Sequence, residues 1–180
     1  MQHKAIFTGK DDACYNGRLT RKAKGIQPAL LDNLVVRRSF VTAANKSDLL
    51  DGYTAAWSAH DVSAILSYFT DDCVYEDATL GVVNRNKQEF KAFLEQDFRA
   101  FPDFVQKELL RFASGDYACL EWSMSGTHLG DYPGMPVTGK SFVDVRGVSV
   151  MELSEGKIRR TTDFWDVTSF LRQLGLAPAE

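Results

Sequence analysis

Residues Gly126 to Asp166, GTHLGDYPGMPVTGKSFVDVRGVSVMELSEGKIRRTTDFWD, decide the fold of this chain. A loop rich in Gly and Pro comes first, and apolar residues then alternate with polar ones on both sides of a Ser-Glu-Gly turn at 154–156. This pattern predicts two long antiparallel strands joined in a hairpin. We expect these strands to belong to a curved sheet around a pocket, with ionisable side chains pointing into it.

The segments before Gly126 predict helices first and strands afterwards. Apolar residues recur every three to four positions over 48–59, after Asp61, and from Asn86 to Phe101. Asn86 begins a capping box with Glu89, and the proline that follows Phe101 ends this third helix. The period then changes to two, which predicts strands at about 104–112, 117–127, 140–153 and 157–165, and a short helix at 170–174. Helices followed by strands are typical of an α+β domain.

Three shorter features complete the expected fold. Asp71 and Asp72 predict a turn, and residues 73–77 after them predict a short strand. Gly147, inside the longest predicted strand, indicates a bulge or bend, because a glycine weakens regular strand pairing.

The composition of the chain argues against some classes of binding partner. The chain has 180 residues, a net charge of −3 and a pI of about 5.6, which argues against electrostatic binding of nucleic acid. No apolar run approaches the roughly 20 residues of a membrane span, so we expect no membrane association. The three cysteines, Cys14, Cys73 and Cys119, form no CxxC pair, which favours reduced thiols and a cytoplasmic location.

The first 46 residues differ from the rest of the chain. They hold nine of the 21 Lys and Arg residues but only three of the 24 Asp and Glu residues. Arg38-Ser39-Phe40 is typical of the end of an organelle presequence, whereas Asp11 and Asp12 are unusual in one. We therefore expect residues 1–46 to be a basic extension, either loosely attached or an import signal, and residues 47–180 to form the domain.

The order and spacing of these elements resemble the SnoaL-like branch of the nuclear transport factor 2-like superfamily. The resemblance covers roughly residues 48–176 and includes the Gly-Thr-His-Leu-Gly segment at 126–130. It implies a cone-shaped α+β barrel in which three N-terminal helices pack on a strongly curved mixed sheet, with a homodimer formed through that sheet. The same fold supports several activities, so the site has to decide the function.

Two members of the superfamily resemble parts of this chain. From Gly52 to Gly81 the sequence resembles the ketosteroid isomerases, which places Tyr53 at their oxyanion tyrosine and Asp77 at their general base. Their second oxyanion group, a protonated aspartate, corresponds to a position near the apolar Val148. The resemblance therefore implies a carboxylate base and a phenol donor, but half of the oxyanion site is missing.

Residues 136–170 resemble limonene epoxide hydrolase. This comparison places Asp163 at the water-activating aspartate and Tyr75 at a water-orienting tyrosine, whereas Trp122 and Met124 stand where that enzyme has an arginine and a second aspartate. Because two of these three relay groups, the arginine and the second aspartate, are missing here, epoxide hydrolysis is the weakest of the functions considered. The mixture of features is closest to the polyketide cyclases, which the resemblance implies use a carboxylate, sometimes with a histidine, and no cofactor.

We therefore expect four catalytic side chains, Asp163, Asp77, His128 and Tyr53, around one apolar cavity. The expected substrate-binding residues are mostly aromatic: Tyr75, Trp122, Met124, Trp57 and Trp165. For Asp163 a purely structural ion pair with Arg146 or Arg159 is the alternative. Asp97 interrupts the aromatic face of the third helix, and we expect a partly exposed position at its edge.

The predicted function is acid–base chemistry without a cofactor on a small hydrophobic carbonyl compound, either cyclisation or isomerisation through an enolate. A dimeric module that binds a hydrophobic ligand without catalysis is the alternative. The three histidines, His3, His60 and His128, are scattered, so no metal is expected.

Overall fold

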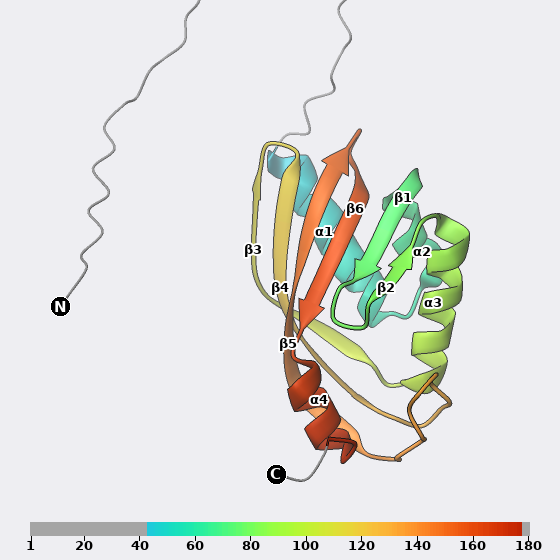
Figure 1. The fold of residues 1–180 in the computed structure, drawn as a ribbon. Coiled ribbons are helices and arrows are strands. Elements are labelled where there is room, and N and C mark those ends of the chain that lie inside the picture. The colour runs from blue at the N-terminus through green and yellow to red at the C-terminus, as the bar shows by residue number, and fades with distance from the viewer. Residues whose placement is uncertain (1–42, 178–180) are drawn as a thin grey trace, which may run out of the picture. The chain divides into compact units, whose positions relative to one another are not determined.

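The computed structural model describes residues 43–177, with side chains described from Lys46 onward (Figure 1). The elements follow one another as α1 (Ala43–Ser58), α2 (Val62–Ser67), β1 (Phe69–Asp77), β2 (Val82–Asn84), α3 (Lys87–Ala100), β3 (Val105–Ser114), β4 (Tyr117–Thr127), β5 (Ser141–Ser154), β6 (Lys157–Trp165) and α4 (Val167–Leu174). The strands form one mixed sheet in the order β2-β1-β6-β5-β4-β3. The predicted α+β cone fold is confirmed.

The sheet brings the two ends of the domain sequence together. β1 pairs with β6 in parallel, and every other neighbouring pair is antiparallel. The register of β4 against β5 shifts between Met124 and Gly126, and that of β5 against β6 shifts between Glu152 and Leu153. Such irregularities bend long strands, and the bending gives the sheet its concave face.

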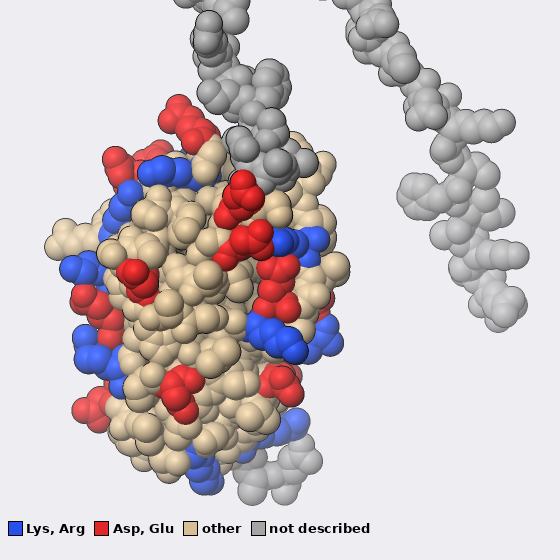
Figure 2. All heavy atoms as spheres, turned by 180° about the vertical axis from the view of Figure 1, so that it is seen from behind, with Lys and Arg blue, Asp and Glu red and all other residues tan. Residues whose placement is uncertain are grey.

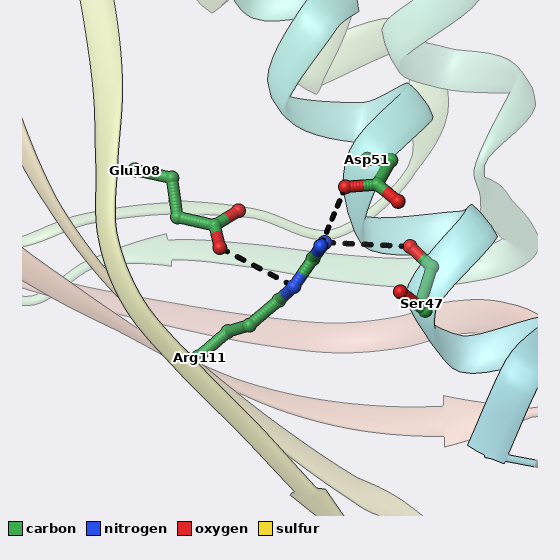
Figure 3. A network of polar contacts seen from close by, with 4 residues as sticks. All are labelled: Ser47, Asp51, Glu108 and Arg111. Carbon is green, nitrogen blue, oxygen red and sulfur yellow. Dashed lines mark hydrogen bonds and ion pairs between the residues drawn. The ribbon is translucent and has the colours of Figure 1, made fainter.

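Helix α1 covers part of this sheet and is held by a polar network at its first turns (Figure 3). Arg111 of β3 reaches Asp51 of α1 at 2.6 Å and Glu108 of its own strand at 3.2 Å. The same guanidinium donates a hydrogen bond to the Ser47 carbonyl. Exposed ion pairs contribute at most about 1 kcal/mol, so this network mainly fixes the position of α1, while its buried residues provide the stability.

Helix α3 stands beside β1 and β2 (Figure 1). Asn86 caps its N-terminus by accepting a hydrogen bond from the Glu89 amide at 2.9 Å, as the capping box predicts. At the other end, the amides of Leu129 and Gly130 both donate to the Ala100 carbonyl. These two bonds attach the Gly- and Pro-rich loop to α3, so both segments reach the same side of the concave face.

The structure corrects three local predictions. Asp71 and Asp72 lie inside β1, which begins at Phe69, and not in a turn before it, although the register of β1 against β6 shifts between Phe69 and Val74 and regular pairing begins at Val74. β2 was not predicted from the sequence, because its three residues are too few to show an alternating pattern. α1 begins at Ala43, several residues before the predicted start. The predicted basic extension lies mostly in residues 1–42, outside the described part of the chain.

Gly147 does not mark the bulge that the sequence indicates. Its pairing with Trp122 on one side and Trp165 on the other is continuous. A Cβ at this position would lie 2.6 Å from Cζ2 of Trp122, so the indole ring packs directly on the glycine. Ser149 holds the ring there by accepting a hydrogen bond from its Nε1 at 2.9 Å.

We expect Gly147→Ala to lower the free energy of unfolding by about 2–3 kcal/mol, because the Trp122 ring has to move in a packed interior. Gly115→Ala is the matched control. Its φ of +55° is unfavourable for alanine, at about 1 kcal/mol, but no heavy atom of the described residues lies within 4 Å of the added Cβ. Urea unfolding of both variants measures the difference. Equal losses at the two sites would contradict the close packing of Trp122.

Candidate active site

The concave face of the sheet, α3, α4 and the loop before β5 enclose a cavity of about 350 Å³. Most of its wall is apolar and aromatic. Three carboxyl groups interrupt this surface, those of Asp77, Asp97 and Asp163. The aromatic wall consists of Trp57, Tyr75, Phe98, Phe101, Phe104, Trp122, Tyr132, Phe142, Trp165 and Phe170. A cavity of this size takes a small organic molecule.

Asp163 comes from β6 and is almost completely buried, with 6% of its surface exposed. The Tyr75 hydroxyl donates to its Oδ2 at 3.0 Å, and the Thr161 hydroxyl donates to its Oδ1 at 3.4 Å. Burial raises the pKa of Asp163 to about 7, and the charge of Asp77 acts in the same direction. A carboxyl group that titrates near neutrality can accept and release a proton under physiological conditions.

A second row of side chains fixes this carboxyl group. Ser149 of β5 hydrogen-bonds to Asp163 and accepts a hydrogen bond from the Trp122 indole. The alternative of a structural ion pair for Asp163 is wrong, since Arg146 pairs with Glu121 and Arg159 pairs with Glu152. Asp163 is therefore held by neutral donors.

Asp77 lies at the end of β1, opposite Asp163 in the parallel β1–β6 register. Residues paired in register present their side chains to the same face, which is why two aspartates 86 positions apart reach one cavity. Trp165 donates to Asp77 Oδ2 through its indole Nε1 at 2.9 Å, and the Leu80 amide donates to Oδ1 at 2.8 Å. Burial raises the pKa of Asp77, and these two donors partly offset the rise.

Asp97 is partly exposed, as the sequence predicts, but its side chain lies on the cavity wall and not at an outer edge of α3. The Tyr132 side chain, from the loop before β5, hydrogen-bonds to its carboxyl group. Burial raises the pKa of Asp97 to about 8, and the charge of Asp77 raises it further. Its position on the aromatic face, four residues after Phe93, was the signal in the sequence.

Among the described residues, no Lys, Arg or His side chain lines the cavity. The three carboxyl groups therefore have no cationic partner there, and each is stabilised by hydrogen bonds alone. In a space of low polarity, protons remain on some of these groups at neutral pH, because a buried charge without a counter-ion is costly.

Two of the predicted catalytic residues lie away from the cavity wall. Tyr53 is buried in the core, where its ring packs against Trp57, Tyr68 and Phe69. Burial raises its pKa well above the usual range. A phenol enclosed by other side chains cannot contact a molecule in the cavity without a rearrangement of the core.

His128 is also fully buried, behind the wall that Phe101 forms. Its amide donates to the Lys140 carbonyl and its carbonyl accepts from the Gly139 amide, each at 3.0 Å. Its Nδ1 lies 3.4 Å from the Thr138 hydroxyl. This arrangement fits a residue that anchors the two ends of the loop.

All five predicted substrate-binding residues, Tyr75, Trp122, Met124, Trp57 and Trp165, line the cavity. Gln106 of β3 was not predicted from the sequence. It is buried on the wall, and its Oε1 has no hydrogen-bond partner among the described residues. It can accept a hydrogen bond from a bound molecule. The alternation of side chains along β3 predicts that this residue points inward, but it belongs to no recognisable sequence motif.

The fold is an α+β cone barrel. Its site is a mostly apolar cavity whose wall also carries carboxyl groups. The family model of the SnoaL-like polyketide cyclases matches residues 47–174. The chain belongs to this family. No curated protein matches the chain.

Solved structures resemble the same domain. AclR, a candidate hydroxylase from Streptomyces galilaeus, is 23% identical, with a TM-score of 0.66 over 77% of this chain and 89% of its own. TsrD from Streptomyces laurentii is 20% identical, with a TM-score of 0.68 over 76% and 98%. A candidate polyketide cyclase from Pseudomonas putida is 25% identical, with a TM-score of 0.62 over 69% and 94%.

Two further observations concern the described residues only. No helix among them is long and apolar enough to span a membrane. Basic and acidic side chains are interspersed on the face in Figure 2, where neither sign forms a broad patch.

Proposed function

We propose that this protein catalyses cofactor-independent acid–base chemistry on a small hydrophobic carbonyl compound, with an enolate as the intermediate. The observation that carries the proposal is the position of Asp163, a buried carboxyl group on the wall of an aromatic cavity, where burial raises its pKa to about 7. Membership of the polyketide cyclase family supports the same class of chemistry.

In the proposed reaction the ionised Asp163 removes a proton from the carbon next to a carbonyl group. The C–H electron pair forms a C=C bond, and the carbonyl π electrons move to oxygen. In an isomerisation the proton returns to another carbon. In a cyclisation the enolate carbon attacks a second carbonyl of the same molecule, and the new alkoxide takes up a proton. Tyr75 keeps Asp163 oriented through its 3.0 Å hydrogen bond.

The experiment uses 2-tetralone, a small aromatic ketone, in D₂O at neutral pD. Proton NMR measures the loss of the hydrogens next to the carbonyl group as deuterium replaces them. We expect the protein to accelerate this exchange above buffer and above an equal concentration of an unrelated acidic protein. No acceleration, with binding of the ketone demonstrated, would contradict the proposed chemistry.

A ligand-binding module without catalysis is the second candidate. A neighbour with a ketosteroid isomerase-like fold, from Catenulispora acidiphila, was solved in complex with trimethylamine; it is 19% identical, with a TM-score of 0.62 over 72% of this chain and 93% of its own. Aromatic faces and carboxylates attract small ammonium ions. Trimethylammonium binding that strengthens as pH rises through 7 and 8, without ketone exchange, would favour this candidate.

We also propose a homodimer formed through the outer face of the sheet. Six residues of neighbouring strands form the patch on this face that we call the outer patch: Leu110, Phe112, Cys119, Val148, Val150 and Phe164. Phe112 is 63% exposed and Val150 is 47% exposed. The Glu121–Arg146 ion pair lies beside these residues, since Glu121 is paired in register with both Leu110 and Val148. Exposed apolar residues gathered on a sheet face are typical of a protein interface, and a second copy offers an identical patch across a two-fold axis.

We expect the wild-type chain to be a dimer and Phe112→Glu to be a monomer of 20.1 kDa by light scattering. Phe112 lies on the edge strand β3, and a charge placed there opposes association because its burial against an apolar surface is costly. Leu129→Glu is the control, since Leu129 is 56% exposed but lies outside the outer patch, and this variant should remain dimeric. A monomeric wild-type protein at high concentration would contradict the dimer.

A further inference from the structure

The proposed reaction uses a base, and the cavity also holds a carboxyl group suited to the opposite role. Asp97 comes from α3, whereas Asp163 comes from the sheet. Both line the cavity, and Asp77 influences the pKa of each. The carboxyl groups therefore come from two separate structural elements that enclose the same space.

Tyr132 fixes the Asp97 carboxyl group from one side. Its ring packs against Phe101, with centroids 5.9 Å apart, and its carbonyl accepts a hydrogen bond from the Met135 amide at 3.0 Å. The Tyr132 side chain hydrogen-bonds to Asp97. A carboxylic acid that accepts a hydrogen bond on one oxygen can still donate its own proton from the other.

The surroundings keep a proton on Asp97. The polar groups that interact with it are the Tyr132 hydroxyl and the Asp77 carboxyl, of which the second disfavours ionisation. Burial raises the pKa of both Asp97 and Asp163 far above the ordinary range of a carboxyl group, so one of them can stay protonated at neutral pH while the other is ionised. Asp97 differs from Asp163 in its position, on α3 and beside Tyr132 instead of on the sheet.

We propose that Asp97, oriented by Tyr132, is the proton donor to the substrate oxygen, opposite the base Asp163. This assignment rests on the proposed function and adds the residue that the ketosteroid isomerase comparison left without a counterpart near Val148. Asp97 is the catalytic residue of the pair, and Tyr132 is a positioning residue.

The proton balance of the step is complete. Asp163 gains the proton of the C–H bond that breaks, while the carbonyl oxygen receives a hydrogen bond and then the proton of Asp97. The enolate of the proposed reaction is thereby protonated on oxygen to an enol, with Asp163 neutral and Asp97 ionised. In the reverse direction the enol O–H returns its proton to Asp97, and Asp163 delivers hydrogen or deuterium to carbon. No oxidant or reductant takes part.

The first experiment repeats the 2-tetralone exchange with Asp97→Asn and Tyr132→Phe. Asp97→Asn keeps a hydrogen-bond donor but cannot transfer a proton, so we expect a rate about 10- to 100-fold lower, with little change in KM. Tyr132→Phe should lower kcat less, because the acid is retained but less well oriented. Glu95→Gln is the control on the same helix, since Glu95 is exposed and pairs with Lys91, and it should match the wild type.

The second experiment needs no turnover. Fluorescence titration compares the affinity for 2-naphthol, whose hydroxyl oxygen stands in for an enol oxygen, with that for naphthalene. We expect the wild type to prefer 2-naphthol by about tenfold, and Asp97→Leu to lose this preference while still binding naphthalene. Near-UV circular dichroism verifies that each variant is folded.

The two proposals fail in different ways. Exchange that depends on Asp163 but is unchanged in Asp97→Asn and Tyr132→Phe overturns the role of Asp97 and leaves the proposed function intact. Absence of exchange in the wild type contradicts the proposed function. In that case an unchanged naphthol preference in Asp97→Leu also overturns Asp97 as the donor, and its loss supports Asp97 as the group that binds the ligand oxygen.

Discussion

Asp163→Asn is expected to lower the rate of deuterium exchange into 2-tetralone by about 10²- to 10⁴-fold, the range that general bases contribute. Asn has the same shape, and its Oδ1 can still accept the hydrogen bond from Tyr75 that Asp163 Oδ2 accepts at 3.0 Å. It cannot take up a proton from carbon. The expected loss therefore lies in kcat, with little change in the affinity for the ketone.

Glu152→Gln is the matched control for this prediction. Glu152 is a carboxylate on the neighbouring strand β5 that pairs with Arg159, not with the cavity, and its replacement should leave the exchange rate unchanged. NMR time courses at several ketone concentrations give kcat and KM for each variant. A rate in Asp163→Asn within a factor of about three of wild type would exclude Asp163 as the base and leave Asp77 as the next candidate.

The same substitution is expected to stabilise the folded protein at alkaline pH, by roughly 1–3 kcal/mol at pH 8. The pKa of Asp163 is about 7 in the folded chain and near its ordinary value of 3.8 in the unfolded chain. Between these values the folded state binds more protons than the unfolded state. The free energy of unfolding of the wild type therefore decreases as pH rises from about 4 to about 7, and the ionised group then remains buried at a cost.

Asn carries no ionisable group, so the variant lacks this contribution to the pH dependence. Urea unfolding at pH 4.5, 6 and 8 should give curves that are similar at the lowest pH and separate as pH rises, with the variant more stable at pH 8. Asp97→Asn should change the pH dependence in the same direction, because burial also raises its pKa. A constant difference between wild type and Asp163→Asn at all three pH values would show that Asp163 does not have a raised pKa.

Loss of stability in exchange for a reactive group is common at active sites. Here the three carboxyl groups share a cavity with aromatic walls and have no Lys, Arg or His partner among the described residues lining it. A folded domain that only needed stability would favour neutral side chains at these positions. The cost is consistent with selection for proton transfer or for a ligand that compensates the charges.

Much of the fold was predictable because its signals are local. The capping box at Asn86, the glycine turn at 154–156 and the alternation along β5 and β6 are patterns in which each residue acts on its neighbours. Predictions failed where distant parts of the chain decide the structure. Asp71 and Asp72 have turn propensity, and they lie in an irregular stretch of β1, because Phe69 before them and Val74 after them both pair with the distant strand β6.

The same difference between local and distant signals applies to the residues of the candidate site. Asp163 and Asp77 could be identified from the sequence through the resemblance, and the parallel β1–β6 register explains why both reach the cavity. Tyr53 and His128 were identified in the same way, yet the structure buries both behind the wall. A residue type at a familiar position does not determine which way its side chain points when neighbouring rings occupy the space.

The sequence by itself determined the α+β order, the helix caps and hairpin turn, and the strands that carry Asp77 and Asp163. Only the tertiary structure decided that Asp97 of α3 and Tyr132 of the loop face the same cavity as those two residues. The physical reason is that propensity and periodicity act over a few residues. Burial and the proton affinity of a carboxyl group depend instead on all side chains around it, here contributed by segments as far apart in the sequence as β1 and β6.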